Sequence, residues 1–252
     1  MQTDRIVLRP RSPAEAIELG LHLTRANWLS QIALMQALLL PVLLLGAGLA
    51  LLFSPLLLLT LIWFKPTLDR ALLHQLSNDL LARPAGAATI LRQWRQWWFG
   101  GHAVSLLWRR FIPGRSVVLP IWQLERLKGA RRNQRARSLN HNDRGSSTSL
   151  TFLASMVELT LLASTVALIV SFAPEQWTDG MQFFDWLAVN ANVDSFWWLL
   201  ALAYLPALAL VEPFYVGAGF GIYLNQRSRL ECWDLEPQLD ALVARHHSRG
   251  HA

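Results

Sequence analysis

The chain contains a run of 37 residues without a charged side chain, from Trp28 to Phe64, and most of them are Leu, Ala, Val or Ile. The hydrocarbon core of a bilayer is roughly 30 Å thick, and about 20 apolar helical residues cross it. The run is therefore too long for one crossing and about right for two short ones. It predicts an all-α, polytopic membrane protein.

Composition supports a membrane address. Charged residues make up only 16% of the 252 residues, and the apolar ones gather in three stretches, 28–64, 150–172 and 196–223. The single cysteine, Cys232, excludes an internal disulfide and a Cys-rich metal site. The net charge of +6 fits loops held beside anionic lipids on the cytoplasmic side. We therefore expect the lipid bilayer, and not nucleic acid, as a partner.

The distribution of Lys and Arg predicts the orientation. Four of these residues precede position 28, fifteen lie between Lys65 and Arg144, and four follow position 226. None lies in 173–195, which carries four acidic residues. The positive-inside rule then keeps both termini in the cytoplasm and requires the first run to be a hairpin. We expect its turn at 46–48, because a turn at Ser54-Pro55 leaves about ten residues to return.

This frame gives about four transmembrane helices plus cytoplasmic and interfacial amphipathic helices. No signal peptide is expected, because the first apolar run is longer than an h-region. The segments are an N-terminal cytoplasmic amphipathic helix (1–27), the transmembrane hairpin (28–64), a basic cytoplasmic or interfacial segment (65–149), the third and fourth helices with a short acidic periplasmic loop at 173–195 (150–223), and a cytoplasmic tail (224–252). The pattern Ser12-Pro13-Ala14-Glu15 predicts a capping box at the start of the first helix.

The 65–149 segment is patterned as helices. Lys65-Pro66 is expected to end the second span, and Pro84 to open a helix with interfacial tryptophans. The expected interfacial anchors are Trp94 and Trp98, together with Trp233 in the tail. A further helix is expected from about Pro120, followed by a flexible loop over 138–149. Its basic residues are candidates for contact with lipid or a partner: Arg126, Lys128, Arg131, Arg132, Arg135 and Arg137.

Two carboxylates, Glu158 and Glu212, fall inside predicted spans. An ionisable group at membrane depth is a functional-site hypothesis by default. Antiparallel helices place the two at similar depth, and if they meet, one of them is protonated. One interpretation is a proton- or cation-linked site. The other is a structural acid that is protonated or bonded to Tyr204, Tyr215, Gln36 or a cytoplasmic Arg.

The last span carries further signals. Pro213, directly after Glu212, and Pro206 predict a helix that is bent or broken at membrane depth. Such breaks line transport sites in carriers, and they also occur as packing kinks. Gly217 and Gly221 form a GxxxG pair that allows another helix to approach closely, including one from a second copy of the chain.

No catalytic constellation is present. The sequence has no HExxH motif, no nucleophile elbow and no phosphate-binding glycine loop. The histidines are scattered. We therefore predict no catalytic residue, no cofactor and no metal site, and we lean towards a protein that is not an enzyme.

Three stretches carry a resemblance to known proteins: Glu212 to Glu236 (EPFYVGAGFGIYLNQRSRLECWDLE), Leu8 to Ala16 (LRPRSPAEA), and Lys65-Pro66 with Asp69-Arg70. They resemble uncharacterised multi-pass bacterial inner-membrane proteins encoded near a MoxR-type AAA+ ATPase, von Willebrand A-type proteins and a transglutaminase-related membrane protein. A fainter likeness is to the membrane domain attached to some glycerophosphodiester phosphodiesterases. The resemblance implies an accessory role in the cell envelope and carries over no catalytic residue.

Two functions follow from these expectations. The first is a non-enzymatic inner-membrane scaffold or accessory subunit that binds proteins through its basic cytoplasmic helices, with an AAA+ ATPase system as one partner. The second is a small proton- or cation-linked carrier or channel subunit that uses Glu158 and Glu212. A membrane-embedded enzyme acting on lipid is a third reading, without a motif to support it.

Overall fold

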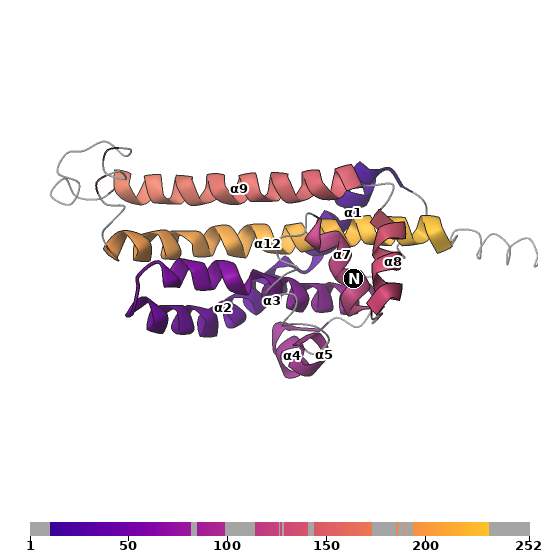
Figure 1. Cartoon of the computed structure of the whole chain (residues 1–252), viewed down its shortest axis with the longest axis horizontal. Coiled ribbons are helices and arrows are strands. Elements are labelled where there is room, and N and C mark those ends of the chain that lie inside the picture. Colours follow the sequence, from indigo (N-terminus) through magenta and orange to yellow (C-terminus); the bar gives the residue numbers. More distant parts are fainter. Residues whose placement is uncertain are drawn as a thin grey trace, which may run out of the picture.

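The computed structural model describes residues 11–81, 85–98, 114–125, 127, 129–140, 144–172, 185, 189 and 194–231, and this part of the chain is helical without a strand (Figure 1). Three of its helices are long and apolar enough to cross a membrane, over Trp28–Ala50, Gly145–Ser171 and Asp194–Leu230. The chain is thus an all-α membrane protein. The helices are α1 (Pro13–Ala26), α2 (Trp28–Ala50), α3 (Leu56–Leu80), α4 (Ala87–Arg92), α5 (Trp94–Trp98), α7 (Arg115–Gln123), α8 (Gly129–Asn140), α9 (Arg144–Ser171) and α12 (Asp194–Glu231).

The helices α2 and α3 form an antiparallel hairpin whose turn lies at residues 51–55. The expected turn at 46–48 is wrong, because α2 continues through both glycines of that segment. At Gly46 an added Cβ would come 3.0 Å from the Leu57 side chain of α3, so this glycine serves close helix packing. The true turn is fixed by the Ser54 hydroxyl, which donates to the Asp194 carboxylate at 2.8 Å.

The second helix of the hairpin was expected to end at Lys65-Pro66, and this expectation is wrong. α3 runs without a break from Leu56 to Leu80. A proline removes one helix hydrogen bond, and this loss is offset by the burial of the following turns, from Leu68 to Leu76. The charges that α3 carries at Lys65, Asp69 and Arg70 keep it out of the set of apolar helices that match a membrane span.

The helix α12 is the central element, and α1, α2, α3, α7, α8 and α9 all contact it. It is one continuous helix that contains Pro206 and Pro213, so the expected break is absent. α9 lies along it (Figure 1) and begins at Arg144, so the expected loop over 138–149 is wrong for its described residues. The start of α9 is held by tertiary contact, since the backbone N–H of Gly114 donates to the Thr151 hydroxyl at 3.0 Å.

The helix α1 begins with the predicted capping box, which is confirmed. The N–H of Glu15 donates to the Ser12 hydroxyl at 3.3 Å, and the N–H of Ser12 donates to the Glu15 carboxylate at 3.1 Å. One face of α1, formed by Ala16, Gly20 and Thr24, is buried against the C-terminal half of α12.

Glycines make this contact between α1 and α12 possible. A Cβ built on Gly20 would overlap the backbone of Gly217, and a Cβ on Gly221 would overlap the carbonyl of Ala16. The two backbones therefore touch over several turns. The Gly217 and Gly221 pair packs against α1 of the same chain, so this face of α12 is already occupied within one molecule.

The described helices between α3 and α9 form two pairs: α4 and α5 contact α2 and α3, and α7 and α8 contact α12. The expected helix from about Pro120 is instead two helices, α7 and α8, with Pro120 inside α7. Gly114 starts α7 with a φ of 74°, a conformation that a glycine adopts without strain. α5 docks on α3 through Trp97, whose carbonyl accepts a hydrogen bond from Arg70 Nε at 2.8 Å. Of the expected anchors, Trp94 is exposed and Trp98 is half-buried against Trp97.

The glycine contact gives a first prediction. Gly20→Ala should lower the free energy of unfolding by about 1–3 kcal/mol, because the new methyl group meets backbone atoms of α12 that cannot rotate away. Gly48→Ala, in α2, is the matched control, since nothing lies within 4 Å of its added Cβ. It should be neutral or stabilising by up to about 1 kcal/mol. Unfolding in detergent micelles measures both, and equal effects would contradict the close α1–α12 contact.

Candidate functional site

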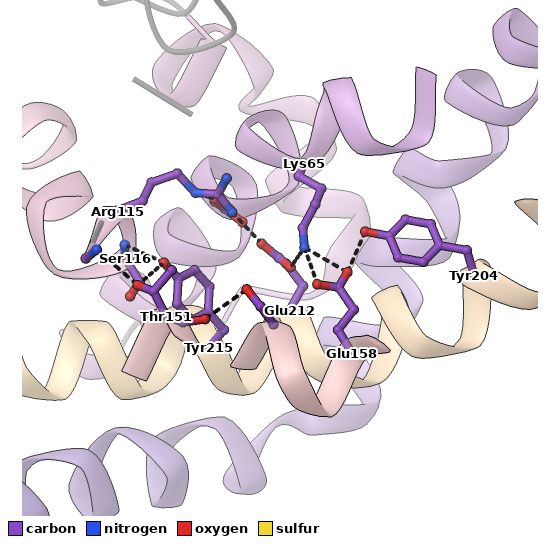
Figure 2. A network of polar contacts seen from close by, with 11 residues as sticks. Lys65, Arg115, Ser116, Thr151, Glu158, Tyr204, Glu212 and Tyr215 are labelled. Atoms are coloured by element: carbon purple, nitrogen blue, oxygen red, sulfur yellow. Dashed lines mark hydrogen bonds and ion pairs between the residues drawn. The ribbon is translucent and has the colours of Figure 1, made fainter. Parts of the chain in front are cut away.

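The two acids singled out in the sequence meet at one lysine. Lys65 Nζ, on α3, lies 2.7 Å from Glu158 Oε2 and 2.8 Å from Glu158 Oε1, on α9. The same ammonium lies 3.1 Å from Glu212 Oε2, on α12 (Figure 2). Glu158 and Glu212 are therefore joined by a cation, and one ion cluster ties three helices together.

A second cation completes the cluster. Arg115, the first residue of α7, places Nε 2.7 Å from Asp69 Oδ2 and Nη2 2.9 Å from Glu212 Oε1. Burial alone would lower the pKa of the Arg115 guanidinium, but the carboxylates of Asp69 and Glu212 raise it, so that its pKa lies above its ordinary value. Arg115 therefore stays charged and binds α7 to both α3 and α12.

Hydroxyl groups surround the charges. The Tyr204 hydroxyl donates to Glu158 Oε1, and the Tyr215 hydroxyl lies 3.1 Å from the Thr151 hydroxyl (Figure 2). Tyr204 and an Arg are among the partners that the sequence predicts for a structural acid. The structure places Tyr204 on Glu158 and Arg115 on Glu212.

Helical spacing brings these groups to one point. Lys65 and Asp69 are four residues apart on α3 and share a face, as do Glu212 and Tyr215, three apart on α12. A pocket of about 140 Å³ lies among them, a volume that holds about four waters. Its lining includes Thr151, Ser155 and Glu158 from α9, Glu212 and Tyr215 from α12, and Lys65 and Arg115.

The sequence pattern does not single out Lys65, Asp69 or Arg115 as site residues. Lys65 marks the expected end of a span, and the other two lie in the segment expected to be cytoplasmic or interfacial. The opposite charges at positions 65 and 69, one helical turn apart, were the signal that could have shown a polar face within a continuing helix.

The remaining predicted residues lie elsewhere. Pro213 follows Glu212, and its carbonyl accepts a hydrogen bond from the Thr24 hydroxyl of α1 at 3.4 Å. On α8, Arg131 and Arg137 are exposed, while Arg135 pairs with Glu125 at 3.1 Å. Arg132, also on α8, is half-buried. Arg126, Lys128 and Trp233 lie outside the described residues.

Comparison with known proteins gives no match from which a role for the site could be taken. No protein-family model matches the chain, and neither does a curated protein or a solved structure. The chemistry must therefore be argued from these side chains.

The cluster has the chemistry of an ion-pair network with water access. Within the described residues, no group of three or more His, Cys, Asp or Glu side chains is arranged to hold a metal ion. The carboxylates contact cations and hydroxyls. Such an arrangement joins helices, and two of its carboxylates, those of Glu158 and Glu212, line the pocket.

Removal of one cation tests the cluster. Arg115→Gln should lower the free energy of unfolding by about 3–5 kcal/mol, because it leaves Asp69 and Glu212 buried with an uncompensated negative charge. Arg137→Gln, at an exposed position on α8, should change it by less than about 0.5 kcal/mol. Denaturation in mixed detergent micelles provides the measurement. Equal stability of the two variants would show that Arg115 does not compensate buried charge.

Proposed function

We propose that the protein is a non-enzymatic accessory subunit of a cell-envelope complex in a bacterial inner membrane, and that it binds a protein partner through its basic cytoplasmic helices. The observation that carries this proposal is the pair of exposed arginines on α8, Arg131 and Arg137. Contacts through Glu125 join α8 to α12. The resemblance to inner-membrane proteins encoded near a MoxR-type AAA+ ATPase agrees with the proposal.

Several contacts make α8 a fixed surface. Leu139 of α8 is buried in the main core, and Arg135 pairs with Glu125. Glu125 in turn accepts a hydrogen bond from the Tyr223 hydroxyl of α12 at 3.0 Å. Arg131 and Arg137 of α8 are exposed. A rigid, positively charged helix of this kind suits a partner with an acidic surface.

The proposal includes a topology of four crossings with both termini in the cytoplasm. α2, α3, α9 and the first half of α12 form the crossings, and α3 needs its turns beyond Lys65 to span, because only nine residues, 56–64, precede that charge. The turn at 51–55 bonds to Asp194 at one end of the bundle, and α8 lies beside the C-terminal half of α12 at the other (Figure 1). The positive-inside rule puts the end with α8 in the cytoplasm.

Charge reversal on α8 tests the proposed function. The double variant Arg131→Glu and Arg137→Glu should lose copurification with a MoxR-type AAA+ ATPase, because the complementary charges become repulsive. Arg92→Glu, on α4, is the control and should retain the ATPase. Retention by the α8 variant at wild-type level, with both variants folded, would exclude this face as the binding surface.

A second candidate function is a small proton- or cation-linked carrier or channel subunit. It is favoured by one observation, that Glu158 and Glu212 line the same polar pocket. For this function, Glu212→Gln should abolish proton-coupled flux into proteoliposomes while the protein still folds. A Glu212→Gln variant with wild-type folding and wild-type phenotype would remove the carrier from consideration.

A further inference from the structure

Two carboxyl groups of the ion cluster lie on one guanidinium. Arg115 places Nε 2.7 Å from Asp69 Oδ2 and Nη2 2.9 Å from Glu212 Oε1, so the two acids are neighbours. Asp69 is fully buried, and among the described residues its one ion pair is with Arg115. Two neighbouring ionised carboxylates repel each other, whereas one shared proton removes the repulsion.

The balance of charge in the cluster points the same way. Within the part of the chain that the structure describes, the three carboxyl groups of Asp69, Glu158 and Glu212 contact two cations, Lys65 and Arg115. Fully ionised, the cluster would carry one net negative charge inside a helical bundle, where an uncompensated charge is expensive. One bound proton makes it neutral.

No other charged group of the described helices supplies the missing positive charge. The further titratable groups that face the cluster are the hydroxyls of Tyr204 and Tyr215, both on α12. Arg70 follows Asp69 on α3 but points towards α5, where its Nε donates to the Trp97 carbonyl at 2.8 Å.

We propose that the cluster binds one proton, which Asp69 carries and donates to Glu212. The contacts of the three acids assign the proton. Glu158 accepts hydrogen bonds from Lys65 and Tyr204, and Glu212 contacts both cations. Among the described side chains, Asp69 forms one ion pair, with Arg115. Asp69 is therefore the acid whose ionised form has the least compensation.

Glu212 provides the route for the proton. It lines the pocket, whereas Asp69 lies behind it and does not. A hydronium ion in the pocket gives its proton to Glu212 and leaves a water molecule. Glu212 then passes the proton to Asp69 and returns to its carboxylate form. This proton site does not depend on the partner-binding function proposed above.

Infrared spectroscopy tests the assignment on the whole protein in nanodiscs. At about pH 7, where a solvated Asp is ionised, the wild-type protein should show the carbonyl band of a protonated carboxylic acid. Asp69→Asn, which mimics the protonated form, should fold and lose that band. Asp79→Asn, at the far end of α3, should keep it.

Isotope labelling gives an independent answer should Asp69→Asn fail to fold. Protein labelled with ¹³C at the aspartate carboxyl groups should show the band at lower frequency, and protein labelled at the glutamate carboxyl groups should not. Asp79→Asn in the aspartate-labelled protein should leave the shifted band in place. Absence of the band from the wild-type protein, its survival in folded Asp69→Asn, or a shift with labelled glutamate would overturn the proposal.

Discussion

The pairing of Lys65 and Arg115 with three carboxyl groups is the interaction on which the arrangement of the helices depends. Charges placed among apolar helices lose their hydration, and their mutual attraction repays that loss only with close geometry. Here each cation contacts carboxylates on two different helices, at 2.7–3.1 Å. Few side chains of α9 are buried: Val166 and Val170 pack with Ala203 of α12, while Glu158 and Thr151 add polar contacts to Tyr204 and Tyr215 of the same helix.

The same cluster connects α12 to the helices α7 and α8. Arg115 starts α7 and reaches Glu212, while α7 leads on to Glu125 and the arginine helix α8. On the opposite side of α12, the glycine contact with α1 holds the N-terminal helix. The two faces use different physics: buried charge compensation on one, and close backbone packing on the other. Together they would present α8 to a partner as part of a rigid body.

Much of the fold follows from the sequence, and the failures share a cause. The apolar runs predicted the helical membrane class, Ser12 and Glu15 the first cap, and Glu158 and Glu212 the acids at the site. The turn at 46–48 and the end at Lys65-Pro66 were wrong, because Gly46 and Pro66 were read as breakers when tertiary packing keeps both inside helices. Arg115 could not be predicted as a site residue, because its role depends on its contact with Glu212, which lies 97 positions further along the chain.

The direct test of the account is a double-mutant cycle on Arg115 and Glu212, measured as free energies of unfolding in mixed detergent micelles. If the two side chains compensate each other as buried charges, each single change to Gln is destabilising, and the double variant is more stable than the sum of the two predicts, by about 1–3 kcal/mol. Additive effects, within about 0.5 kcal/mol, would contradict the account, because the two charges would then not be coupled.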